Sequence, residues 1–368
     1  MTPTATTRDS NSRLTFLDWT RGIAAAIMLQ GHVFHSFTRS NLRTDGPYII
    51  SQLFGGVGPA IFLVLTGVTL GFIMDRGQRK ELPPFQRWLT AIRRSGYLFM
   101  LAFLFRFQLW LFAAGQSPWT DLFKVDVLNC MGLAIGLMSI MAIFTTEDRV
   151  RLCAVLGIVI AAASPVISAI DWTWLPPQIY NYFVPNTNYF AFFPWAAFIA
   201  FGISIGSLLR IVKPEDVNRT MQWACLLGLA LLFAGEYFSG VSYSIYAKSD
   251  FWLNSPWLIF MKLGSVLLVM SFAFIWTEYG LKNSWSWVRQ LGTTSLLVYW
   301  VHIELVYGRW FGSWKENLNT AQVIGCAAIL IMLMIGLSVL KTRWSKIEWS
   351  SVLALSRPFS PPRRVSGD

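Results

Sequence analysis

One stretch of the chain carries ionisable groups at spacings that could support chemistry inside a membrane. Residues 14–37 are hydrophobic and long enough to cross a bilayer, yet they include Asp18, Arg21, His32 and His35. Such groups are costly inside a membrane, so they indicate function. Asp18 and Arg21 stand one helical turn apart and can neutralise each other. His32 lies fourteen residues after Asp18, which is about 21 Å along a helix axis. Imidazole is well suited to general-base work near neutral pH.

The composition indicates an integral membrane protein. Of the 368 residues, 54% are hydrophobic and only 13% are charged, which is about half the charged share of a soluble domain. A net charge of +11 would suggest nucleic acid in a soluble protein. Here the basic residues fall mostly in short loops between apolar segments, so they report topology. We therefore expect the lipid bilayer, and not nucleic acid, as a partner.

The pattern of apolar segments predicts an all-α integral membrane protein, a polytopic bundle of about ten transmembrane helices. The segments are 14–37, 53–74, 95–114, 125–144, 152–170, 189–209, 221–240, 256–276, 291–310 and 320–340. The distribution of Lys and Arg places both termini in the cytoplasm. We expect a disordered N-terminus over 1–12, a transmembrane domain over 13–345 and a cytoplasmic tail over 346–368. The aromatic outer loop 171–188 either anchors at the membrane interface or roofs a cavity.

Further titratable residues fall in the outer halves of the expected helices. Charges facing lipid singly would be prohibitive, so we expect the set to converge on a polar cavity open to the outer side. The set is His32, His35, Arg106, Asp126, Glu236, Lys262, His302 and Glu304. A structural role is the alternative for each member, with Arg106 paired to Asp126, and Lys262 paired to Glu236 or Glu304.

Basic residues crowd the side expected to be cytoplasmic, next to Asp18 and Arg21. They are Arg76, Arg79, Lys80, Arg87, Arg93 and Arg94. The positive-inside rule accounts for such a loop in most membrane proteins. The functional alternative is a dock for a phosphate-bearing donor, because Arg offers bidentate hydrogen bonds to phosphate.

A metal site is not expected. His32, His35, His302, Asp126 and Glu304 are competent ligands, but no two of them follow the HExxH spacing. The four cysteines all lie in apolar segments without metal-ligand spacing, and we interpret them as small core residues.

Five blocks of sequence together resemble a known family. They are RLTFLDWTRGIAAAIMLQGH (13–32), GPAIFLVLTGVTLGF (58–72), DVLNCMGLAIGL (126–137), YFAFFPWAAFIAFG (189–202) and LGTTSLLVYWVHIELVYG (291–308). In order and spacing the chain resembles the heparan-α-glucosaminide N-acetyltransferase-like family of multi-pass membrane acyltransferases over residues 13–340. The resemblance implies transfer of an acetyl or other acyl group from cytoplasmic acyl-CoA, typically acetyl-CoA, to a sugar amine or hydroxyl on the outer side. It also leaves a homodimer open, and we expect a bacterial inner membrane.

The resemblance covers the positions of Asp18, Arg21, His32 and His302, and the roles expected of the other residues follow from their types and positions. We expect catalysis by His32, His302 and Glu304, and donor binding by Asp18, Arg21, Arg93 and Arg94. The expected acceptor or oxyanion contacts are His35, Asp45, Arg106, Asp126 and Lys262. The chain departs from the animal lysosomal members, which carry an important His in the outer loop after the first helix. Residues 39–47 here have no His, and Asp45 is their only acid, which argues against heparan sulfate as the acceptor.

Two other classes of function fit the same residues. A proton-coupled transporter or flippase would also hold charges within the membrane, although the chain shows no repeat symmetry or paired broken helices. A non-catalytic sensor or assembly subunit predicts that His32→Ala and His302→Ala leave function intact.

Overall fold

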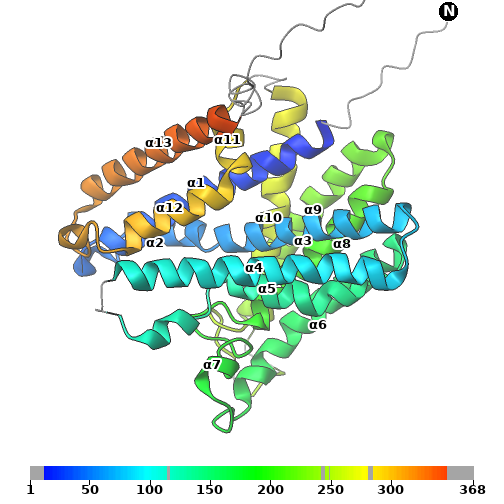
Figure 1. The fold of residues 1–368 in the computed structure, drawn as a ribbon, viewed down its shortest axis with the longest axis horizontal. Coiled ribbons are helices and arrows are strands. Elements are labelled where there is room, and N and C mark those ends of the chain that lie inside the picture. Colours follow the sequence, from blue (N-terminus) through cyan, green and yellow to red (C-terminus); the bar gives the residue numbers. More distant parts are fainter. Residues whose placement is uncertain (1–11, 114–116, 242–244, 248, 281–284, 346–368) are drawn as a thin grey trace, which may run out of the picture.

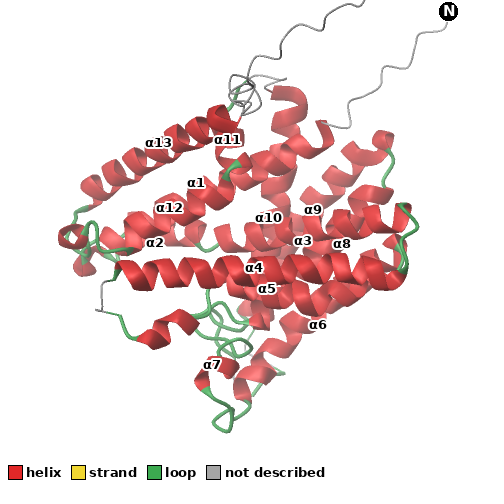
Figure 2. Cartoon of the chain, in the orientation of Figure 1, coloured by secondary structure: helices red, strands yellow, loops and turns green. Residues whose placement is uncertain are grey.

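The computed structural model describes residues 12–113, 117–241, 245–247, 249–280 and 285–345, which form helices and no strands (Figures 1 and 2). The helices are α1 (Ser12–Phe37), α2 (Gly46–Gly55), α3 (Gly58–Arg79), α4 (Pro84–Phe112), α5 (Val127–Met138), α6 (Thr146–Ala169), α7 (Pro177–Tyr180), α8 (Phe192–Ile211), α9 (Val217–Ser239), α10 (Pro256–Ile275), α11 (Trp287–Thr293), α12 (Ser295–Tyr307) and α13 (Thr320–Ser345). The predicted all-α membrane bundle is confirmed. The predicted terminal segments lie outside the described residues, apart from Ser12.

Each of the ten predicted apolar segments contains a helix, but the helices differ in length. Within the described residues, seven helical stretches are long and apolar enough to cross a membrane. The helix α1 is not among them despite its 26 residues, because its ionisable residues lower its hydropathy. The α5 helix, with 12 residues, is too short. The α12 helix has 13 residues, which is about 20 Å and shorter than the hydrocarbon core of a bilayer. It follows α11 after a break at Thr294, where φ and ψ leave the helical region, so the predicted segment 291–310 contains the end of α11 and all of α12.

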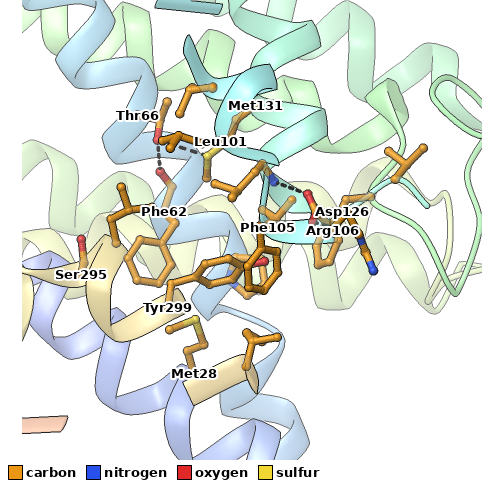
Figure 3. A pocket seen from close by; sticks show the side chains of 18 of the residues that line it. Met28, Phe62, Thr66, Leu101, Phe105, Arg106, Asp126, Met131, Ser295 and Tyr299 are labelled. Atoms are coloured by element: carbon orange, nitrogen blue, oxygen red, sulfur yellow. Dashed lines mark hydrogen bonds and ion pairs between the residues drawn. The ribbon is translucent and has the colours of Figure 1, made fainter. Parts of the chain in front are cut away.

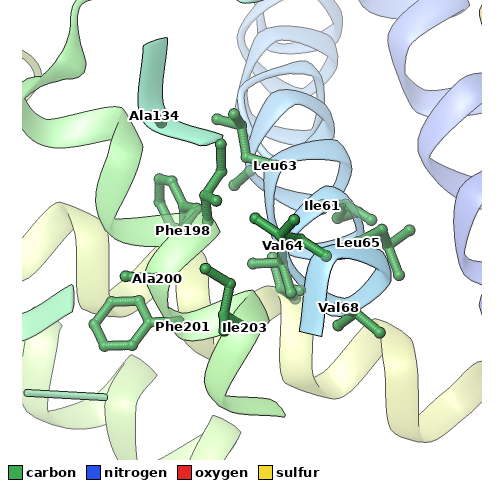
Figure 4. Close-up of a cluster of buried hydrophobic side chains, with 14 of the residues drawn as sticks. Ile61, Leu63, Val64, Leu65, Val68, Ala134, Phe198, Ala200, Phe201 and Ile203 are labelled. Carbon is green, nitrogen blue, oxygen red and sulfur yellow. The ribbon is translucent and has the colours of Figure 1, made fainter. Parts of the chain in front are cut away.

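The core of the bundle is the contact of α3 with α8. Gly67 of α3 and Gly202 of α8 lie at the crossing, where a Cβ on Gly202 would be 2.1 Å from the Val64 carbonyl oxygen. Small residues allow membrane helices to approach this closely. Around the crossing, branched side chains of α3 lie beside Phe198 of α8, whereas the ring of Phe201 points away from α3 (Figure 4). Phe201 lies against Gly157 of α6 instead. The packing makes α3 a rigid wall for the cavity described below.

A buried carboxylate ties together the ends of several helices. Asp75 of α3 accepts hydrogen bonds from Arg79 Nε at 2.9 Å and Arg210 Nε at 2.7 Å. Thr146, at the start of α6, donates to the same carboxylate at 3.2 Å and accepts from Arg149. The basic loop thus has a structural component, because part of its charge neutralises Asp75.

We expect Asp75→Asn to lower the free energy of unfolding by about 2 kcal/mol, because the amide cannot pair with the two guanidinium groups. The effect is below that of breaking a fully buried pair, since both guanidinium groups are partly exposed. Thermal unfolding in detergent measures the change. Asp216→Asn is the matched control, because that aspartate is exposed and its side chain does not cap α9. Equal unfolding temperatures for the two variants would contradict the expectation.

Candidate active site

A cavity of about 740 Å³ lies between α1, α3, α4, α5 and α12 (Figure 3). One end, the basic mouth, is lined by Arg21, Arg94, Tyr97, Ser295 and Leu296. The other end, the polar mouth, is lined by His35, Thr187, Asn188 and Tyr307. The mouths are about 20 Å apart, judged from the residues between Arg21 and His35 on α1. Between them the wall is apolar and buried, formed by Met28, Leu65, Phe105, Leu128 and Met131.

Two histidines from distant parts of the sequence meet beside this cavity. His32 Nδ1 lies 2.9 Å from His302 Nε2, and the two rings are stacked with an interplanar angle of 15°. His32 lines the cavity, whereas His302 is fully buried behind it. His32 and His302 therefore lie together, as predicted. Of the two, His32 is the one that a ligand in the cavity can reach.

The hydrogen-bond partners determine which ring nitrogens carry hydrogen. His302 Nδ1 is 2.6 Å from the Val298 carbonyl oxygen. A carbonyl only accepts, so Nδ1 carries the hydrogen, and in a neutral ring Nε2 must then accept. His32 Nδ1 is therefore the donor between the two rings. This leaves the Nε2 lone pair of a neutral His32 free to take a proton from a ligand in the cavity.

The polar-mouth end of α1 is fastened to α12 and to the segment that follows it. Ser36 Oγ donates to the Val306 carbonyl oxygen at 3.0 Å, and the backbone of Phe37 accepts from Leu318 N at 3.0 Å. Arg43 forms an ion pair of 3.0 Å with Glu316. These contacts join segments about 270 residues apart in sequence. They keep α1 and α12, which carry His32 and His302, next to each other.

Arg106 and Asp126 form an ion pair in the wall of the cavity. The distance from Arg106 Nε to Asp126 Oδ2 is 3.2 Å. Asp126 Oδ1 also caps α5 by accepting from the backbone N–H groups of Leu128 and Asn129. The capping fixes the carboxylate, which in turn holds the guanidinium of α4 against the cavity. The pairing that the sequence offered as a structural alternative is thus present, and both residues line the cavity.

The loop between α6 and α8 covers the polar mouth. Thr187 and Asn188 are exposed and line the cavity, so the loop roofs it, as one of the two sequence interpretations proposed. Tyr182 anchors the loop by accepting a hydrogen bond from Asn129 Nδ2 at 3.2 Å. Burial raises the pKa of the Tyr182 hydroxyl, which keeps it protonated near neutral pH.

The basic mouth holds two guanidinium groups in different states. Arg21 is paired with Asp18 at 3.0 Å and donates to Thr69 Oγ1 at 3.0 Å. Arg94 forms no ion pair with the described residues, and its buried Nε has no hydrogen-bond partner among them. One positive charge at this mouth is therefore neutralised, and the other is available to an anion.

Several predicted site residues lie outside the cavity lining. Asp18 does not line the cavity but forms an ion pair with Arg21, which does. Arg93 is exposed on α4, and Asp45 is exposed at the start of α2. Glu304 is buried and accepts from Trp310 Nε1 at 3.0 Å. Lys262 and Glu236 do not converge on the cavity with the histidines.

Lys262 has a different environment from either pairing considered from the sequence. Within the described residues it forms no ion pair with Glu236 or Glu304, and Glu236 is exposed. Its ammonium lies 4.7 Å from the ring centroid of Trp195 and close to Gly56, which follows the C-terminus of α2. An aromatic face and a helix C-terminus both stabilise a cation. The side chain therefore has a structural explanation.

Three side chains of the site were not identified from the sequence. Tyr299 lines the cavity beside the histidine pair, Tyr307 contacts His35 Nδ1 through its hydroxyl at 3.3 Å, and Thr69 binds Arg21. The only sequence signal for Tyr299 was its position one helical turn before His302 in the last block. Thr69 lies in an apolar block whose other residues pack in the core.

The described residues show no group of three or more His, Cys, Asp and Glu side chains that could hold a metal ion. Whether the protein works without a metal stays a prediction. The four cysteines are free thiols. Cys130 and Cys153 are buried, as expected of core residues, whereas Cys225 and Cys326 are only partly buried.

The fold and the cavity define a multi-pass integral membrane protein with a histidine pair at a cavity that reaches both ends of the bundle. The model of the family described as heparan-alpha-glucosaminide N-acetyltransferase, catalytic, matches residues 13–237. The match covers more than half of the chain, so the protein belongs to this family of membrane acyltransferases. The matched residues include His32 but not residues 291–308, the block that contains His302. No curated protein matches the chain.

Proposed function

We propose that the protein transfers an acetyl or other acyl group from cytoplasmic acyl-CoA to a sugar amine or hydroxyl on the outer side of a bacterial inner membrane. One observation carries the proposal. A single cavity joins a basic mouth to a polar mouth, and the accessible imidazole of His32 lines it. The Lys and Arg distribution places the basic mouth on the cytoplasmic side, where acyl-CoA is the donor expected for this family.

The basic mouth suits the phosphates of CoA. Arg94 offers an unpaired guanidinium, and Arg21 is held in place by Asp18 and Thr69. Ser295 is the first residue of α12 and lines the same mouth, so the positive end of that helix points to it. The narrow pantetheine arm would then follow the apolar wall towards His32.

The reaction uses His32 as a general base and then as a general acid. The acceptor O–H or N–H bond breaks, its proton passes to His32 Nε2, and its electron pair forms a bond to the thioester carbon. The carbonyl electron pair moves to oxygen, giving a tetrahedral oxyanion. Collapse expels the CoA thiolate, which takes the proton from His32. His302 is a positioning residue, because it holds the tautomer in which His32 Nε2 is free.

We expect Arg94→Gln to raise the KM for acetyl-CoA about tenfold, because a charge-assisted hydrogen bond to phosphate is lost. Steady-state kinetics of the purified protein measure the change. Arg93→Gln removes the same charge from the neighbouring position, where the side chain is exposed and outside the cavity lining. We expect a much smaller rise for that variant. An equal effect of the two substitutions would mean that the basic surface as a whole, and not the cavity, attracts the donor.

The test of the function uses the full chain in nanodiscs with radiolabelled acetyl-CoA and a panel of amino sugars and neutral glycans. Label appearing on an acceptor supports the acyltransferase. The same protein in liposomes, with label added on one side, tests the carrier. Movement of intact acceptor across the liposome without acylation, together with no CoA binding, would refute the proposal in favour of the transporter.

A further inference from the structure

Tyr299 is a cavity-lining residue whose hydroxyl has no hydrogen-bond partner in the part of the chain that the structure describes. Tyr299 extends from α12 into the space between Met28, Phe62 and Phe105 (Figure 3). No hydrogen bond of its hydroxyl is present within the described residues, whereas His32 and His302 bond to each other and Tyr307 bonds to His35. The hydroxyl is not one of the fully enclosed unpartnered atoms, so it is open to the cavity, where a phenylalanine would offer a ligand no hydrogen-bond donor. The hydroxyl therefore indicates a partner that comes with the ligand.

The ring of Tyr299 is fixed by its neighbours. Its centroid lies 5.9 Å from that of His302 in an edge-to-face arrangement with an interplanar angle of 71°. On another side it lies 5.5 Å from the ring of Phe105. Arg106 and Asp126 line the same cavity. The ring of Tyr299 is thus held between the His302 and Phe105 rings, in a cavity that the Arg106–Asp126 ion pair also lines.

We propose that Tyr299 is a catalytic residue whose O–H donates a hydrogen bond to the carbonyl oxygen of the acyl donor and to the oxyanion formed from it. This inference rests on the proposed acyl transfer. Tyr299 keeps its proton throughout, while the acceptor proton moves to His32 and then to the thiolate. Oriented donors aimed at a developing oxyanion act strongly in a site that excludes water, because no reorganisation is needed during the reaction.

The kinetic test is Tyr299→Phe in the full chain. We expect kcat for acetyl transfer to fall about 10²-fold, with less than a threefold change in the KM for acetyl-CoA. The unfolding temperature should stay the same or rise, since only an unpaired hydroxyl is removed. Tyr237→Phe is the control, because Tyr237 is exposed on α9 and outside the cavity. Activity within threefold of wild type, or a loss that follows a fall in unfolding temperature, would overturn the proposal.

A binding test separates this inference from the proposed reaction. One unreactive acetyl-CoA analogue replaces the thioester sulfur by methylene and keeps the carbonyl. A second analogue also replaces the carbonyl by methylene. Tyr299→Phe should weaken binding of the first about fivefold and leave the second unchanged, as measured by calorimetry. Equal affinities of the variant and wild type for the carbonyl analogue would overturn the role of Tyr299 even if acyl transfer occurs. Absence of transfer by wild type that still binds the analogues would instead count against the reaction.

Discussion

Replacing His32 with Gln lowers kcat for acyl transfer by about 10²–10⁴-fold, the range lost when a general base is removed. Gln preserves a polar side chain of similar size but cannot accept the proton of the acceptor. His302 and the Val298 carbonyl stay in place behind it, so the cavity should keep its shape. Transfer of labelled acetyl to the best acceptor, with substrates at saturation, measures the loss.

The control for the His32 variant is donor binding. The basic mouth lies about 16 Å from His32 along α1, judged from the eleven residues that separate it from Arg21, so CoA affinity should change by less than threefold. His302→Gln should cost less than His32→Gln, since His302 acts only by orienting its neighbour. Full transfer activity of His32→Gln would exclude the general-base role of His32, and another group would have to take the acceptor proton.

The sequence predicted most of the helices because hydrophobic length is a local property. Segments of about twenty apolar residues specify spans one at a time, and each predicted segment contains a helix. The break between α11 and α12 was not predicted. At Thr294 the residues on both sides remain apolar or small, so hydropathy alone has no signal there.

The sequence predicted the members of the site less completely because convergence depends on how each helix is rotated. The pairing of Arg106 with Asp126, offered as the structural alternative to a place in the cavity, is present, and both residues also line the cavity. Within the described residues, Lys262 neither lines the cavity nor forms the alternative pair with an acidic residue, because Trp195 and the end of α2 stabilise it. Such partners leave no charge pattern in the sequence. Tyr299 was overlooked for the same reason, since a tyrosine in an apolar helix is usually an interfacial or packing residue.

Gly22→Ala should destabilise the protein by about 3 kcal/mol or more and impair acyl transfer together with stability. Gly22 of α1 touches α11 so closely that a Cβ would lie 1.8 Å from the Val288 carbonyl oxygen. On the opposite helix, a Cβ on Gly292 would lie 1.8 Å from the Asp18 carbonyl oxygen. Backbone atoms cannot move aside as side chains do, so the cost is at the upper end for overpacking. The helices must separate to admit the methyl group.

Separating α1 from α11 would change the shape of the basic mouth, because two of its lining residues lie beside the contact. Arg21 directly precedes Gly22, and Ser295 lies two residues after the end of α11. We therefore expect a higher KM for acetyl-CoA as well as a lower unfolding temperature. Gly325→Ala on α13 is the matched control, since a Cβ there meets no atom within 4 Å. Alanine favours a helix over glycine by about 1 kcal/mol, so this control should be neutral or stabilising. If both variants unfold at the wild-type temperature, α1 and α11 are not in backbone contact, and the close approach cannot be what positions Arg21 at the mouth.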